Sequence, residues 1–236
     1  NILIFLPLFF SKNLFNKELF FNNFMGFASF CFTASVVYII NDIQDIEKDR
    51  LHSKKKYRPI ASGQVSIPSA WCIALLTIVL SIVCNYISAK NNIYSWIILA
   101  LYLFTNYLYS IKLKNVPILD ITILVSGFLL RLLYGSVITN IEISKWLFLT
   151  VMSISFYLGL GKRRNELKQE NSTRKVLESY SHEFLDKNMY ICLGLTIVFY
   201  ALWAVDAQTI TRLGTDSLIW TVPLVLIISM KIPMGF

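Results

Sequence analysis

Four oxygen-bearing side chains stand at the start of the polar segment 41–63, directly after an apolar stretch: Asn41, Asp42, Asp45 and Asp49. If the apolar stretch is a helix that continues, all four side chains share an arc of about 100° on its surface. Carboxylates three and four residues apart on a helix repel each other, so a hard divalent cation is the simplest compensation. We therefore predict that they hold Mg²⁺, which prefers oxygen ligands and also binds substrate phosphates. We also predict that Asp45 and Asp49 are catalytic. The alternative is a solvated helix end whose acids pair with nearby lysines.

A basic run follows these acids: Lys54, Lys55, Lys56 and Arg58. An acidic metal-binding face followed by positive charge suits a diphosphate, because the metal bridges phosphate oxygens and the basic side chains neutralise the rest. Pro59 and Gly63 interrupt the helical pattern and predict a shaped loop. We predict that Lys55, Lys56 and Arg58 bind substrate. Membrane topology alone also places lysines in such loops, which leaves a second explanation open for each lysine.

A second cluster occupies residues 109–120, YSIKLKNVPILD. Lys114 lies in a short turn between two apolar stretches, Tyr109 near the end of the first stretch and Asp120 just inside the second. Arg131 follows eleven residues later, almost three helical turns and about 16 Å along the same face. Ionisable side chains at such depth face a protein interior or a polar cavity. We predict that these four residues bind substrate, and interhelical ion pairs remain the alternative for Asp120 and Arg131.

A third cluster occupies residues 159–170, GLGKRRNELKQE. Lys162 and Glu166 are separated by four residues, and Arg163 is adjacent. A helix-end salt bridge would explain Lys162 and Glu166 without any function. The stretch returns to the same side as the acidic segment, however, so we predict that Lys162 and Glu166 are catalytic and that Lys162 and Arg163 bind substrate. Three clusters at one surface would form a polar cavity with lipid-facing walls.

The composition shows which elements must position these residues. Of 236 residues, 56% are hydrophobic and only 15% are charged, against roughly 25% charged in a soluble domain, and the mean hydropathy is +0.58. Continuous apolar runs predict membrane-spanning helices and exclude an ordinary soluble domain, a disordered chain and a β-barrel. The predicted spans are residues 1–10, 19–40, 70–89, 93–111, 116–138, 145–161, 189–206 and 217–230.

The distribution of basic residues predicts how this helical bundle lies in the membrane. The loops on the side of the three clusters carry 16 of the 22 Lys and Arg residues. By the positive-inside rule these loops are cytoplasmic. The net charge of +8 therefore indicates loop bias and contact with phosphates or anionic headgroups, and not nucleic-acid binding. The chain reads as one transmembrane domain, 1–236, that we expect to be cut at both ends, and its oligomeric state stays open.

The acidic segment resembles the first aspartate-rich motif of the UbiA-type intramembrane prenyltransferases, NDxxDxxxD followed by RP. The matching residues are Asn41, Asp42, Asp45, Asp49, Arg58 and Pro59. The resemblance implies an all-α bundle of nine spans, about eight of them present here, with a cytoplasmic active-site cavity and Mg²⁺ as cofactor. Family members that transfer prenyl groups to aromatic acceptors or haem precursors typically carry a second motif, DxxxD, after the sixth span. Here Gly161–Leu167 offers a single acid, Glu166.

At this place the chain is similar to a branch of the family that transfers a phosphoribosyl group. The similarity rests on GKRxxEL at 161–167, RPIASG at 58–63, Leu113-Lys114, Arg131 with Gly135, Ser144-Lys145-Trp146 and Leu177-Glu178-Ser179-Tyr180. The branch implies 5-phosphoribosyl diphosphate as donor, a polyprenyl phosphate such as decaprenyl phosphate as acceptor, and a role in cell-wall synthesis. The alternatives are prenyl transfer to an aromatic or tetrapyrrole acceptor and, more remotely, a transporter.

Overall fold

The computed structural model describes residues 1–236 except 91, 169–174 and 232–236, and within these residues every regular element is helical. The longer helices are α2 (Lys17–Gln44), α4 (Ile67–Ala89), α5 (Ile93–Ile111), α6 (Leu119–Thr139), α7 (Lys145–Leu167) and α8 (His182–Val205). The shorter α-helices are α1 (Leu6–Phe9), α3 (Ile46–Leu51), α9 (Ala207–Leu213) and α10 (Val222–Lys231). Five 3₁₀ turns complete the fold: η1 (Ile2–Phe5), η2 (Lys55–Tyr57), η3 (Leu113–Asn115), η4 (Lys175–Ser179) and η5 (Ser217–Thr221). The all-α prediction is confirmed.

Four of the six longer helices start where the sequence provides a cap. The side chains of Asn16, Ser66, Asn92 and Ser181 accept hydrogen bonds from backbone N–H groups in the first turns of α2, α4, α5 and α8. These bonds satisfy donors that a helix start otherwise leaves unpaired, which matters most in a bilayer without water.

The predicted spans match the helices at their apolar centres and differ at their ends. Among the described residues, α2, α4, α6 and α8 are long and apolar enough to cross a bilayer, and α9 with residues 217–230 forms a pair bent by 98°. Residues 1–10, predicted as the end of one helix, instead form the two short elements η1 and α1. The helix predicted to end at 161 continues to Leu167, so residues 159–167 of the third cluster lie on α7 itself, while residues 169 and 170 lie outside the described part of the chain. The predicted count of about eight spans stays a prediction.

Small and hydroxylated residues allow close packing of the helices. Thr33 Oγ1 and Ser81 Oγ are 2.6 Å apart between α2 and α4, and Ser29 Oγ donates to the Ser81 carbonyl at 2.9 Å. At Gly135 in α6, a Cβ atom would lie 2.1 Å from the carbonyl oxygen of Ile4. Glycine is therefore required where η1 crosses α6, a packing device common between membrane helices.

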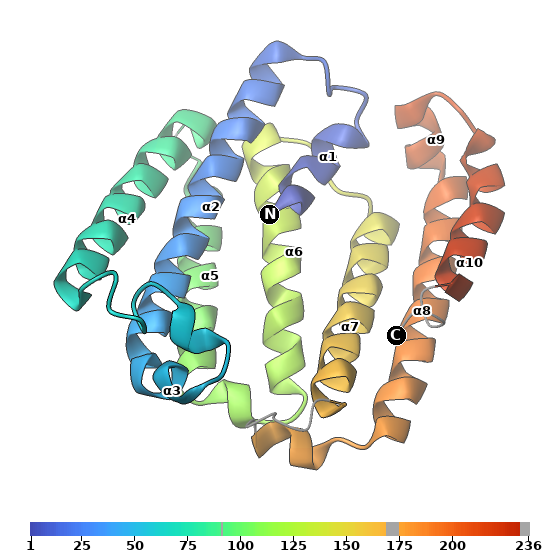
Figure 1. The fold of residues 1–236 in the computed structure, drawn as a ribbon. Helices are drawn as coiled ribbons and strands as arrows, with labels where there is room; N and C mark the ends of the chain where they lie inside the picture. The colour runs from blue at the N-terminus through green and yellow to red at the C-terminus, as the bar shows by residue number, and fades with distance from the viewer. Residues whose placement is uncertain (91, 169–174, 232–236) are drawn as a thin grey trace.

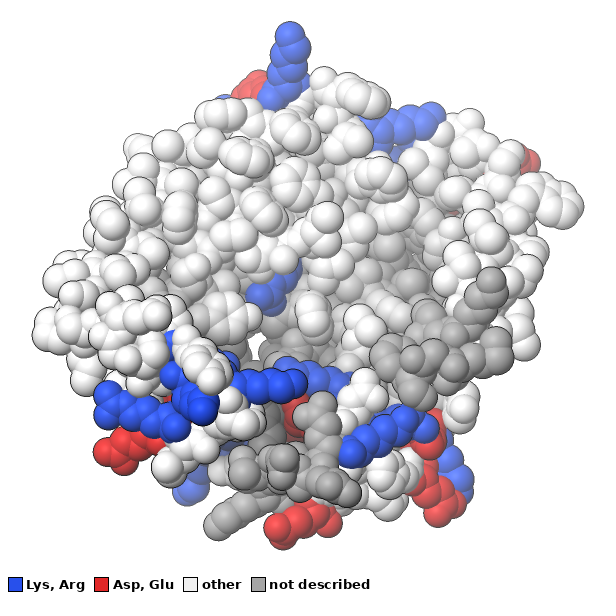
Figure 2. Space-filling view, viewed as in Figure 1, with Lys and Arg blue, Asp and Glu red and all other residues white. Residues whose placement is uncertain are grey.

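The arrangement of the helices brings the polar connections to one end of the bundle. In Figure 1, α6 lies at the centre, with α2, α4 and α5 on one side of it and α7 and α8 on the other. The connections that contain α3, the η3 turn and the η4 turn all lie at the lower end of this view. Figure 2 shows Lys and Arg side chains gathered at the same end, beside acidic side chains.

Candidate active site

The acidic row of Asn41, Asp42, Asp45 and Asp49 crosses a short break between α2 and α3. The helix ends at Gln44, and Asp45 has φ −97° and ψ 12°. Helical hydrogen bonding nevertheless continues across the break, since the Asp45 N–H donates to the Asn41 carbonyl at 2.9 Å and the Asp49 N–H to the Asp45 carbonyl at 2.8 Å. The row therefore stays on one side of the chain, as the sequence pattern predicts.

Arg58 joins two members of this row. Its Nη1 atom lies 2.7 Å from Asp42 Oδ1 and 2.8 Å from Asp49 Oδ2. The Asp49 side chain is almost fully buried, at 5% exposure. Asp45 is more open and lies 3.7 Å from Lys48 Nζ and 3.8 Å from Lys114 Nζ. The acids therefore do pair with basic side chains, and the main partner is an arginine rather than a lysine.

The loop that carries Arg58 has the shape that Pro59 and Gly63 predict. The Val65 N–H donates to the Pro59 carbonyl at 2.9 Å, and Gly63 adopts φ 82°, a conformation that favours glycine. Arg50 Nε donates to the Ala61 carbonyl at 3.1 Å and ties the loop to α3. The loop therefore folds back over the acidic row and brings Arg58 to it.

The donor set of the row suits a hard divalent cation. Within the described part of the chain, no group of three or more His, Cys, Asp or Glu side chains is arranged to hold a metal ion. The Asp42 and Asp49 oxygens nevertheless converge on a single cationic nitrogen, and Asn41, directly before Asp42, supplies an amide oxygen. Carboxylate and amide oxygens are the ligands that Mg²⁺ prefers. The residues thus fit the ion in chemical type, and the Arg58 guanidinium balances the charge of Asp42 and Asp49.

The end of α5 connects the acidic row to the third cluster. Ser110 Oγ donates to the Asn41 side chain, and Tyr109 accepts from Arg163 Nη2 at 3.2 Å. Lys114, in the η3 turn, reaches Asp45. The three clusters predicted from the sequence therefore meet at one end of the bundle.

Arg163 and Asp120 form a fully buried ion pair between α7 and α6. Arg163 Nε lies 2.5 Å from Asp120 Oδ2, both side chains are 0% exposed, and Arg163 Nη1 donates to Glu166 Oε2 at 2.7 Å. For Asp120 the ion-pair alternative is thus what the structure shows. A salt bridge to Lys162 was the alternative for Glu166, and the structure shows Glu166 bound to Arg163.

Tyr180 completes this buried network, and the sequence assigned it no role at the site. Its hydroxyl donates to Asp120 Oδ1 at 2.7 Å and accepts the Ile118 N–H at 2.6 Å. Burial and the bond to Asp120 raise the pKa of Tyr180 to about 12. Ile118 has φ 69° and ψ −46°, and the Leu119 N–H donates across it to the Pro117 carbonyl at 2.8 Å. This strained γ-turn is held by Tyr180. The sequence signal was the stretch LESY at 177–180, 60 residues from Asp120.

Other predicted residues lie apart from this network. Lys55, Lys56 and Lys162 are exposed. Arg131 is half-buried between the helices. Its Nη1 atom donates to the Gly127 carbonyl at 2.6 Å, and its guanidinium carbon lies 4.9 Å from the centre of the Phe30 ring. No acid pairs with Arg131 among the residues the structure describes, so the ion-pair alternative does not apply to it. His52 accepts backbone N–H bonds from Lys54 and Lys55, as a loop residue.

Comparison with known proteins settles the family. The model of the UbiA prenyltransferase family matches residues 4–233, almost the whole chain. The chain belongs to the UbiA prenyltransferase family. A solved structure of a UbiA homolog from Archaeoglobus fulgidus, bound to GPP and Mg²⁺, aligns with a TM-score of 0.77 and 18% sequence identity. The alignment covers 100% of this chain and 83% of that one. At this identity the likeness shows the UbiA fold alone.

Two curated relatives of this UbiA chain share one name. The decaprenyl-phosphate phosphoribosyltransferase of Corynebacterium glutamicum is 33% identical over 211 residues, which are 88% of this chain and 62% of the relative. The protein of the same name from Mycolicibacterium smegmatis is 37% identical over 195 residues, which are 81% of this chain and 60% of the relative. The chain thus spans about three fifths of the length of these relatives.

Proposed function

We propose that the protein transfers the 5-phosphoribosyl group from 5-phosphoribosyl diphosphate to a polyprenyl phosphate and releases diphosphate. The observation that carries the proposal is the identity of 33–37% over 81–88% of the chain to relatives named decaprenyl-phosphate phosphoribosyltransferase. The stretch Gly161–Leu167 also favours phosphoribosyl transfer over prenyl transfer. It holds one acid where the DxxxD motif has two, and that acid, Glu166, binds Arg163 at 2.7 Å.

The donor diphosphate would bind at the acidic row. Asn41, Asp42, Asp45 and Asp49 would hold Mg²⁺, which when bound supplies positive charge to the leaving diphosphate. Arg58 would exchange its carboxylate partners for diphosphate oxygens, since a guanidinium binds either group in the same bidentate way. Lys55, Lys56 and Lys114 would add further charge, and the exposure of the first two leaves them free to move onto the substrate.

The acceptor phosphate would attack the ribose carbon C1. The bond from C1 to the diphosphate oxygen breaks with its electron pair leaving on diphosphate, and a bond from C1 to the lipid phosphate oxygen forms. The sugar becomes oxocarbenium-like between these events, so stabilising the departing charge is the main catalytic task. A phosphate that is already ionised near pH 7 needs no general base. Lys162 would approach the acceptor phosphate or the ribose, while Glu166 would act by orienting Arg163.

The active site would face the cytoplasm in a bacterial inner membrane. Lys and Arg side chains gather at the end of the bundle that holds α3, η3 and η4 (Figure 2), and basic loops stay on the cytoplasmic side. A maleimide reagent that cannot cross membranes should label a cysteine placed at Lys56 only after the cells are opened. Labelling of intact cells would reverse the assignment.

The donor assay tests the reaction. Membranes that contain the protein are incubated with labelled 5-phosphoribosyl diphosphate and polyprenyl phosphate, and separately with prenyl diphosphate and 4-hydroxybenzoate. We expect labelled lipid in the first incubation and its loss when Mg²⁺ is chelated. Product in the second incubation alone would make the protein a prenyltransferase, and solute uptake by proteoliposomes without either product would make it a transporter.

Asp45→Ala tests the metal assignment within the same assay. The side chain is 33% exposed and its two ion pairs are long, at 3.7 and 3.8 Å, so the protein should keep its fold. Transfer should fall at least about 100-fold, as for loss of other charge-stabilising groups. Glu47→Ala, an exposed acid off the row, is the matched control and should keep full activity. Mg²⁺-dependent transfer near the original rate in Asp45→Ala would refute the assignment.

A further inference from the structure

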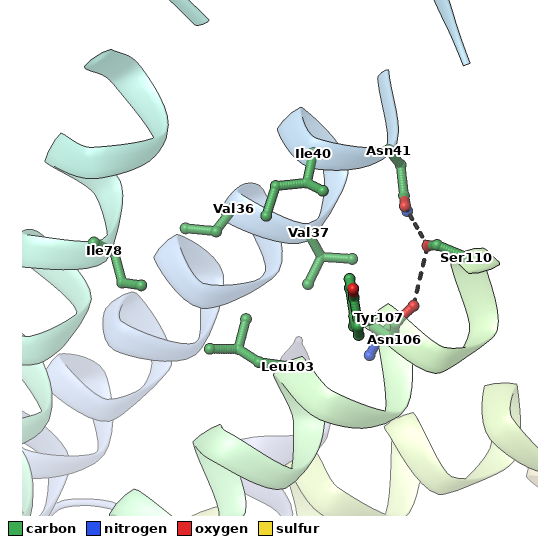
Figure 3. A pocket seen from close by; sticks show the side chains of 9 residues that line it. All are labelled: Val36, Val37, Ile40, Asn41, Ile78, Leu103, Asn106, Tyr107 and Ser110. Carbon is green, nitrogen blue, oxygen red and sulfur yellow. Dashed lines mark hydrogen bonds between the residues drawn. The ribbon is translucent and has the colours of Figure 1, made fainter. Parts of the chain in front are cut away.

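An apolar cavity of about 200 Å³ lies between α2, α4 and α5 and ends at the acidic row. Val36, Val37 and Ile40 of α2 form one wall, Ile78 of α4 another, and Leu103 of α5 the third (Figure 3). At one end the lining becomes polar, where Ser110 Oγ donates to the side chain of Asn41. The cavity thus shares a residue with the predicted metal site and is otherwise lined almost wholly by hydrocarbon.

The packing of α4 explains why the space exists. This helix packs closely along α2, through the hydroxyl contacts at Ser81, and barely touches α5. Its other faces are open, with Leu75 66% exposed and Val79 48% exposed. In a membrane these faces contact lipid, so the gap between α4 and α5 opens from the protein toward hydrocarbon. Water gains nothing in such an apolar space.

We infer that this cavity binds the isoprene units of the acceptor that lie next to its phosphate. The inference rests on the proposed function and names the acceptor subsite for it. The acceptor phosphate reacts at a polar centre while the hydrocarbon chain stays in the bilayer, so the chain needs an apolar path between the two. This cavity is apolar and ends at Asn41, beside the predicted polar centre. Its volume exceeds the ~150 Å³ of a cavity that holds benzene, which is room for about one or two five-carbon units.

The polar end of the cavity suits the phosphate of such a lipid. Asn41 lies one turn from Asp45 on the same face, about 6 Å along the helix, and Lys114 Nζ is 3.8 Å from Asp45 Oδ1. Ser110 adds a hydroxyl at the mouth. A phosphate placed there would meet Lys114 on one side and the donor site on the other, while its first carbons enter the space beside Ile78 and Leu103.

A pair of neighbouring substitutions on α4 tests the subsite. Ile78→Trp fills the cavity, whereas Val79→Trp adds the same ring to the lipid-facing surface. With geranyl phosphate as a two-unit acceptor, Ile78→Trp should raise KM at least about tenfold, because this factor corresponds to the lost burial of about two carbon atoms of the acceptor. Val79→Trp should change KM by less than about twofold. Both variants should bind 5-phosphoribosyl diphosphate like the parent protein in calorimetric titration.

Equal KM values in the two variants would overturn the subsite and leave the proposed reaction intact. A parent protein without any phosphoribosyl transfer would instead overturn the reaction itself. Photolabelling of the unmodified protein gives a second readout: geranyl phosphate with a diazirine on its terminal unit should label α4 or α5 peptides that contain Ile78 or Leu103. A photoreactive phospholipid serves as the competitor probe. If it labels the same peptides and polyprenyl phosphate does not displace it, the cavity holds bilayer lipid and the inference is refuted.

Discussion

Asp120→Asn is expected to destabilise the protein strongly, because it leaves a buried guanidinium short of one countercharge. Asp120 and Arg163 are both 0% exposed and 2.5 Å apart. Removal of one partner from a buried pair costs about 3–5 kcal/mol. Arg163 keeps Glu166 at 2.7 Å, and asparagine still accepts a hydrogen bond, so the lower end, about 3 kcal/mol, applies. For a chain of this size that corresponds to a fall in Tm of roughly 10 °C.

Thermal unfolding in a fixed detergent, followed by tryptophan fluorescence, measures this effect. Asp186→Asn is the matched control, because Asp186 pairs with Arg164, the residue that follows Arg163, in a more open place. The side chain of Arg164 is 23% exposed and that of Asp186 is 36% exposed. The control should cost less than about 1 kcal/mol. The double variant Asp120→Asn with Arg163→Gln removes both charges and should recover part of the loss. A Tm of Asp120→Asn equal to that of Asp186→Asn would refute the buried-pair reasoning.

Two further substitutions test the packing around the site. Tyr180→Phe should cost about 1–3 kcal/mol, because the Ile118 N–H loses its acceptor; chemical denaturation measures it, and an unchanged midpoint would contradict the role of Tyr180. Because the folded pKa of Tyr180 is raised to about 12, the stability it contributes is complete below about pH 10 and is lost as pH rises through 12; Tyr180→Phe should reduce this loss in alkaline melts. Gly135→Ala should lower Tm or prevent folding, since the new Cβ would lie 2.1 Å from the Ile4 carbonyl, whereas Gly194→Ala, with nothing within 4 Å, should leave Tm unchanged.

The sequence predicted the parts of the site that depend on local periodicity. Asn41, Asp45 and Asp49 follow one another at intervals of four residues. An angle of about 100° per residue places them on one side even across the break at Asp45. Hydropathy likewise located the centres of α2, α4, α6 and α8. It failed at the end of α7, because hydropathy reports burial in lipid, and a helix continues into polar residues without a change in its backbone.

Contacts between distant segments were not predictable in this way. Arg58 could be expected near phosphates from its charge, but its bridge between Asp42 and Asp49 depends on how the loop after α3 folds back. The contact of Tyr180 with Asp120 joins residues 60 positions apart, and no periodicity relates them. The pairing of Arg163 with Asp120 likewise depends on the packing of α7 against α6, which spacing within α7 cannot report.

The balance of charge divides the predicted site residues into two groups. Arg163 is fully buried and bound to Asp120, Glu166 and Tyr109, so a phosphate that approached it would have to displace acids already in place. Lys55, Lys56 and Lys162 are exposed and can turn toward an anion without breaking a buried pair. Arg58 stands between the groups, since it is partly exposed and shares its charge with only two carboxylates. Buried pairs are costly to break and exposed ones are not, so substrate phosphates should recruit Arg58 and the lysines while Arg163 holds α6 and α7 in register.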